Sequence, residues 1–353
     1  MRRLLPLLLL LLMGVIPARA ADPPPGRSGQ EPTAGSPVRP STVLRLGDPH
    51  FRGPLAKWNS VRPDEALPES DGRILSPDLH GPTTGPVHRT RLWLMGGTMF
   101  AANAAIVAYF FDTYYNDDFA KTAPFHTFDD WYNADLNVDK LGHIWSAQSY
   151  AQATYHMFRW ANMSQWSAMY WSSGLAFLYQ LEMEITDGLF EKWGFSWWDV
   201  AGNTIGAVWP NLQRIYPSLQ PFMIKMSYHP SAAVKQGWVE HDYLRDYDGF
   251  TYWLALSVED LLPRAARPYW PDWLGIAVGY GANRTMLGDG IYNSRDGVGQ
   301  GEQEWYVALD YDLRKLPGDS KFLLWMKESF NIFHLPAPTI RITPSAVYYG
   351  LYF

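Results

Sequence analysis

Three polar motifs, DKLGH at residues 139–143, EITD at residues 184–187 and SWWDVAGNTIG at residues 196–206, interrupt a stretch that is otherwise rich in apolar and aromatic side chains. Leaving a buried polar group without a partner costs on the order of 2–7 kcal/mol. We therefore expect the polar side chains of the three motifs to pair with one another. Their meeting point would mark a site, and the helices that carry them would decide the fold.

The motifs are expected to lie on three consecutive helices. The pattern of apolar residues predicts helices over residues 139–162, 165–190 and 196–215. Side chains three or four residues apart share one face of a helix. The polar residues follow this spacing, with Asp139 and His143 on the first helix, Gln180, Glu184 and Asp187 on the second, and Asp199, Asn203 and Gly206 on the third. Antiparallel packing would bring these faces together, and Gly206 would allow two helices to approach closely.

Several of these residues also have a purely structural interpretation. Asp199 would complete a capping box with the serine three residues before it. Asp139 would be stabilised near the N-terminus of its helix by the helix dipole, and Lys140 would be a solvated or lipid-facing cation. Glu184 and Asp187 have no capping role on a long helix, so they are the strongest candidates for a site.

One function compatible with the motifs is that of a non-catalytic envelope protein without a cofactor. A fully satisfied network of buried polar groups fixes how elements pack. In this hypothesis the buried cluster locks the helices together or holds a lipid head group. Its binding or structural members would be Lys140, Gln180, Asp199, Asn203 and Gly206.

The alternative is a metal-dependent hydrolase that acts on an envelope lipid or glycan. Its candidate catalytic and metal-ligating residues are Asp139, His143, Glu184 and Asp187. One imidazole nitrogen with several carboxylate oxygens suits a divalent metal such as Mn, Fe or Mg. Such a metal would activate a water molecule. Without a metal, the neighbouring acids would favour the protonated form of His143.

The order and spacing of DKLGH, EITDG and GFSWWD in residues 139–206 resemble the YfiM-like predicted periplasmic lipoproteins, a family of unknown activity. A fainter similarity runs to VanZ-like membrane proteins, which have a similar order of motifs. The resemblance implies a cell-envelope protein, without indicating a reaction. The chain contains no cysteine, so we expect neither disulfides nor the lipidated cysteine that the family description implies.

The N-terminus is typical of a secretory signal. A basic start precedes an apolar run over residues 4–16, and ARA at residues 18–20 fits a cleavage site. We expect residues 1–20 to be removed on export, and the Pro- and Gly-rich residues 21–88 to form a disordered tether. The formal net charge is −6, which provides no basic surface for nucleic acid.

Tryptophan and tyrosine are frequent, with 17 and 21 residues, and both suit the membrane–water boundary. Residues 92–111 form a run long and apolar enough to span a bilayer. Because Arg89 and Arg91 would then lie outside the cytoplasm, against the usual bias, we expect this helix to be buried in a bundle or to contact the outer membrane. The protein is expected to be exported and membrane-associated on the periplasmic side of the envelope, at the outer membrane, with membrane lipid as its partner and no protein partner indicated.

The sequence pattern changes to a period of two after residue 271. The alternation predicts strands at residues 273–281, 304–313 and 339–353. Helices are expected over residues 250–262 and 323–333.

The expected fold class is α+β, a membrane-associated helical bundle followed by a small antiparallel β-sheet. The bundle would occupy residues 89–265 and the sheet residues 266–353. The latter segment is too short for the smallest outer-membrane barrel, which needs about eight strands of 9–11 residues.

Overall fold

The computed structural model describes residues 80, 83, 85–113, 115, 121–131, 135–235, 237, 246–283 and 301–353. All of the described residues belong to one compact unit. The predicted signal peptide and nearly all of the predicted tether lie outside the described residues.

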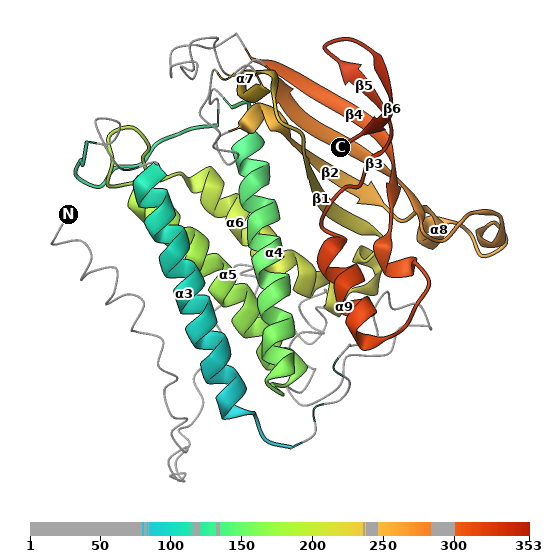
Figure 1. Cartoon of the computed structure of the whole chain (residues 1–353), viewed down its shortest axis with the longest axis horizontal. Helices are drawn as coiled ribbons and strands as arrows, with labels where there is room; N and C mark the ends of the chain where they lie inside the picture. Colours follow the sequence, from blue (N-terminus) through green and yellow to red (C-terminus); the bar gives the residue numbers. More distant parts are fainter. Residues whose placement is uncertain are drawn as a thin grey trace, which may run out of the picture. The chain divides into compact units, whose positions relative to one another are not determined.

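Four long helices form the first part of this unit. Their bounds are Arg89–Thr113 (α3), Val138–Trp160 (α4), Gln165–Asp187 (α5) and Trp197–Ile215 (α6). The last three carry the polar motifs and match the predicted helices to within a few residues. Serine side chains accept a hydrogen bond from the first turn of both α5 and α6, which explains why each helix begins there. α4 packs against both α5 and α6, and Figure 1 shows it between α3 and the sheet.

α4 and α6 approach closely where α6 presents two glycines, Gly202 and Gly206, to α4. A Cβ atom at Gly206 would lie 2.1 Å from the carbonyl oxygen of Ile144, and one at Gly202 would lie 3.0 Å from that of Lys140. Any larger residue at Gly206 would therefore force the two helices apart. This contact sets the distance at which polar groups of α4 and α6 can meet.

α3 is attached to the bundle by one side only. Met95 and Met99 pack with Tyr155 and Phe158 in a buried cluster. Asn103 is also buried and donates to Glu182 of α5, but most other residues of α3 are exposed, and only 17% of the residues in its most apolar stretch are buried. Among the described residues it is the one helix long and apolar enough to cross a membrane. The helix was expected either to be buried in a bundle or to contact the outer membrane. Burial inside the bundle holds for only a few residues of α3.

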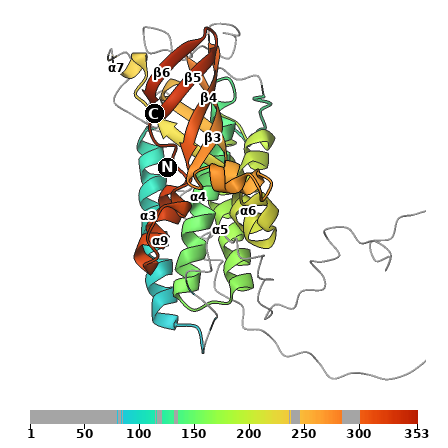
Figure 2. The same cartoon turned by 90° about the vertical axis from the view of Figure 1, so that its right-hand side faces the viewer.

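The second part is a six-stranded antiparallel sheet in which consecutive strands are neighbours. Its strands are Phe222–Tyr228 (β1), Phe250–Leu256 (β2), Leu274–Asn283 (β3), Glu302–Tyr311 (β4), Ala337–Thr343 (β5) and Val347–Tyr352 (β6). Short helices Ala232–Lys235 (α7), Val258–Leu261 (α8) and Lys321–Phe330 (α9) lie in its connections. The fold class is therefore α+β, and Figure 2 shows β3, β4 and β5 side by side.

The predicted helix over residues 250–262 is wrong, because this segment forms β2 followed by the short α8. Its sequence, FTYWLAL at residues 250–256, is almost continuously apolar, and periodicity cannot distinguish such a strand from a buried helix. The sheet also begins earlier than expected, with β1, and residues 339–353 supply parts of two strands instead of one.

Side chains of α4 join the bundle to the sheet region. Trp145 Nε1 donates to the carbonyl oxygen of Ile332 at 2.8 Å, and Gln148 Nε2 donates to that of Ile224 at 2.9 Å. Gln148 is buried, so its bond satisfies a polar group that would otherwise be costly there. α4 is thus shared by both parts of the unit.

Candidate functional site

The site lies where the N-terminal ends of α4 and α6 meet the C-terminal end of α5. The preceding segment, residues 121–131, is held against the entry to α6, since the N–H of Phe128 donates to the carbonyl oxygen of Phe195 at 2.9 Å. Four segments therefore converge on one region. The polar motifs of the three helices contribute most of its side chains.

Lys140 is buried among three carboxylates. Its Nζ lies 2.8 Å from Asp139 Oδ2 and 2.9 Å from Asp199 Oδ1, and it also pairs with Asp130. Burial by itself would lower the pKa of Lys140, but the three acids together raise it above its ordinary value. The interpretation of Lys140 as a solvated or lipid-facing cation is wrong, because the residue is only 7% exposed.

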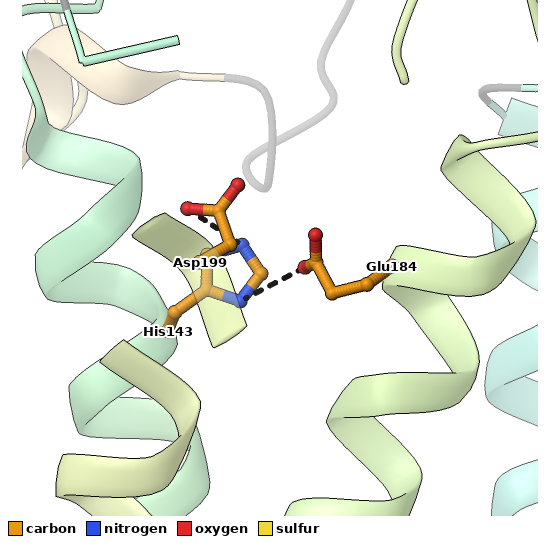
Figure 3. Close-up of side chains that lie close together, drawn as sticks. All are labelled: His143, Glu184 and Asp199. Carbon is orange, nitrogen blue, oxygen red and sulfur yellow. Dashed lines mark ion pairs between the residues drawn. The ribbon is translucent and has the colours of Figure 1, made fainter. Parts of the chain in front are cut away.

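His143 lies between groups of α5 and α6, as Figure 3 shows for the two acids. Its Nδ1 is 3.0 Å from Asn203 Oδ1 and 3.6 Å from Glu184 Oε1, and its Nε2 is 3.7 Å from Asp199 Oδ1. Burial would lower the pKa of His143, but Asp199 and Glu184 outweigh it, so the pKa is raised. A protonated imidazole can thus face acceptors on both of its sides.

Glu184 is 1% exposed and faces two partners. Its Oε2 accepts a hydrogen bond from the N–H of Ser196 at 3.4 Å, while its Oε1 faces His143. Burial raises the pKa of Glu184 to about 8, against the opposing effect of His143. The expected capping box forms only in part. Ser196 Oγ accepts a hydrogen bond from the N–H of Asp199 at 3.1 Å, as in a capping box, but the N–H of Ser196 donates to Glu184. The Asp199 side chain points to Lys140 and His143 instead.

Asp187 and Gln180 lie on the same helix as Glu184 but have other partners. Asp187 accepts a hydrogen bond from the hydroxyl of Tyr115, and burial raises its pKa to about 7. His143 acts on Asp187 through its charge, which opposes this rise. Gln180 donates to Ser146 Oγ, one turn further along α4. The network therefore extends from His143 and Glu184 to Asp187 and Tyr115 on one side, and to Gln180 and Ser146 on the other.

Sequence reasoning did not identify Asp130 or Tyr115 as members of the network. Asp130 accepts a hydrogen bond from Ser196 Oγ at 2.7 Å and pairs with Lys140. Both residues reach the site from segments outside the three helices, where helical spacing gives no signal. The acidic pair at residues 129–130, ten and eleven positions before the buried lysine, was the available clue.

Among the described residues, two groups of side chains have geometry that could hold a metal ion. They are His143, Glu184 and Asp199, and Asp130, Asp139 and Asp199, with one ligand atom of each residue lying within 4.8 Å of those of the others in its group. In the second group the ammonium of Lys140 pairs with all three acids. The predicted metal-ligating set was Asp139, His143, Glu184 and Asp187. The first group shares His143 and Glu184 with this set, and its third member is Asp199.

The fold and the site together define an α+β protein with an acid–lysine–histidine network buried between three helices. Residues 128–214, about a quarter of the chain, match the model of a family described as "predicted periplasmic lipoprotein (DUF2279)". This match confirms the resemblance inferred from the motifs, and it spans the whole of α4 and α5 and nearly all of α6. No curated protein and no solved structure matches the chain.

The stability of the protein is expected to fall as the pH rises from about 4 to 9. Glu184 and Asp187 have folded-state pKa values of about 8 and about 7, above their ordinary values of 4.5 and 3.8. The unfolded chain therefore releases these protons first, and stability that is complete below pH 4 is lost as the pH rises through 7 and 8. Thermal melts across this range measure the effect.

Glu184→Gln should flatten this pH dependence, because the amide cannot titrate. Asp319→Asn is a matched control, since it also neutralises an acid but at an exposed position. A melting temperature of the wild-type protein that stays constant or rises between pH 5 and 8.5 would contradict the assignment of raised pKa values to the buried acids.

Proposed function

We propose that the protein is a non-catalytic component of the cell envelope, exported to the periplasmic side. Its buried network organises three helices and the segment before them, and α3 associates the bundle with a membrane. The observation that carries the proposal is that Lys140 and His143, one turn apart on α4, contact acids from residues 121–131, α5 and α6. The description of the matching family supports the location.

The burial of the network favours organisation of the helices over recognition of a lipid head group. Lys140 is 7% exposed and Glu184 is 1% exposed, so a head group would have to displace packed helices to reach them. Removing one partner from a buried ion pair typically costs about 3–5 kcal/mol, because the other charge is left uncompensated. The network therefore makes the positions of α4, α5 and α6 depend on one another.

The exposed side of α3 supports association with a membrane. Trp93 is 81% exposed and Leu94 is 60% exposed, and Phe100 and Ile106 are also exposed. At the start of the helix, the Arg91 guanidinium lies 4.9 Å from the centre of the Trp160 ring. Arginine and tryptophan at the end of an apolar helix are typical of a membrane–water interface.

Flotation of the full chain with vesicles of phosphatidylethanolamine and phosphatidylglycerol tests the membrane part of this proposal. The wild-type protein should float with the vesicles. Leu94→Lys combined with Phe100→Lys should weaken binding at least tenfold, since each lysine costs about 2.5–3.5 kcal/mol at the centre of an apolar helix.

Ala265→Lys combined with Ala346→Lys serves as the control, because it adds the same charge at exposed positions outside α3. This variant should float like the wild type. A wild-type protein that stays at the bottom of the gradient would refute membrane association. Equal flotation of both lysine variants would show that α3 is not the part that binds the membrane.

A second candidate function, a metal-dependent hydrolase of an envelope lipid or glycan, has one observation in its favour. Glu184 Oε1 is buried and has no hydrogen-bond donor in the described part of the chain, while Asp199 Oδ1 is also buried and lies 2.9 Å from Lys140 Nζ. Together with His143 they could supply two oxygens and one nitrogen to a hard divalent ion. A bound metal would activate water, and these side chains would hold and orient it.

Metal analysis of the purified protein separates the two candidates. The hydrolase candidate predicts a stoichiometric divalent metal that is lost in His143→Gln but kept in His229→Gln, which changes an exposed histidine. The first proposal predicts no stoichiometric metal and a melting temperature that a chelator leaves unchanged. Either result rejects one of the two candidates.

A further inference from the structure

The buried face of the sheet combines an apolar cluster around Trp253 and Tyr306 with a buried ionic group. On the buried face, Lys225, Asp310 and His334 have fully buried side chains. Lys225 Nζ lies 2.7 Å from Asp310 Oδ2, and His334 Nδ1 lies 2.8 Å from Asp310 Oδ1. Antiparallel sheets of water-soluble proteins normally bury their apolar face and expose their polar one. Here the buried face contains an ionic group.

The opposite face presents a row of large apolar side chains across five strands. The row consists of Leu254, Val278, Val307, Ile340 and Tyr348, which are neighbours in the strand register. Each is between 41% and 69% exposed. Figure 2 shows β3, β4 and β5, the middle strands of this row, side by side. An apolar surface of this extent marks a contact with another apolar phase or molecule.

Aromatic pairs stand at both ends of this face. Tyr280 and Trp305 lie with their ring centroids 4.9 Å apart at one end, and Trp273 and Tyr311 are 6.0 Å apart at the other. The seven residue steps from Trp273 to Tyr280 span about 23 Å along the strand at the rise of a strand. A lipid-facing sheet has an apolar band about 25 Å tall between two aromatic girdles. The two pairs on this sheet follow the same order, with an apolar band between aromatic residues.

We propose that this face of the sheet lies against the hydrocarbon of a lipid bilayer, with acyl chains covering the row from Leu254 to Tyr348. Acyl chains fit better than a second copy of the chain, because protein interfaces concentrate aromatic residues at their centre. Here the centre is aliphatic and the aromatic residues are at the ends, as at a membrane–water boundary. The proposal rests on the proposed function in that it needs a membrane-associated protein.

The proposed contact is made by the side chains of one face, and of the two edge strands only β6 carries a member of the row, Tyr348. An open edge is not tolerated in hydrocarbon because its backbone groups lack partners. Part of the edge at β1 is covered, since the N–H of Met226 donates to the carbonyl oxygen of Ile332 at 3.0 Å and the N–H of His334 donates to that of Met226 at 2.9 Å. β6 forms the other edge and borders the lipid-facing surface.

A single introduced cysteine tests the inference, because the chain contains no other. Val307→Cys in the full chain is labelled with an environment-sensitive nitrobenzoxadiazole fluorophore and mixed with vesicles of phosphatidylethanolamine and phosphatidylglycerol. The emission should shift to shorter wavelength and should be quenched when the acyl chains are brominated. Ala346→Cys, in the exposed turn between β5 and β6, is the matched control and should show neither effect.

The outcomes separate this inference from the proposed function. Flotation of the labelled protein without quenching at Val307 would overturn the inference and leave membrane association through α3 intact. Disulfide-linked dimers of unlabelled Val307→Cys in the absence of lipid, with no quenching in vesicles, would show that a second copy covers the face. Failure to float would contradict both proposals.

Discussion

The rest of the bundle depends on the burial of the Lys140 ammonium among three carboxylates. Asp139 comes from the same turn of α4, Asp199 from α6, and Asp130 from the segment before α4. A buried charge is tolerated only with partners that offset its lost hydration. The burial of Lys140 therefore requires α4, α6 and the segment before α4 to meet around its ammonium group. His143 extends the same constraint to α5 through Glu184.

α4 transmits this constraint to the sheet. One part of α4 carries Lys140 and His143, and Trp145 and Gln148, further along the helix, bond to backbone carbonyls of the sheet region. Many of the charged groups inside the unit are thus paired with one another. Apolar side chains remain on the exposed sides of α3 and the sheet, which is the distribution expected of a protein that contacts lipid on its outer surface.

Much of the helical part could be predicted from the sequence, because its polar residues recur at the spacing of one helix turn. The positions of α4, α5 and α6 follow from that spacing. The strand β2 could not be predicted, since FTYWLAL at residues 250–256 lacks alternation. Asp130 and Tyr115 reach the site from outside the helices, and only the three-dimensional path of the chain places them there.

A double-mutant cycle between Lys140 and Asp199 tests the central claim most directly. The free energies of unfolding of Lys140→Met, Asp199→Asn and the double variant would be measured in the same detergent. If Lys140 ties α4 to α6, the double variant should be less destabilised than the sum of the single variants by about 1–3 kcal/mol, as for residues in one buried network. Additivity to within about 0.5 kcal/mol would show that the two residues do not interact and would contradict this account.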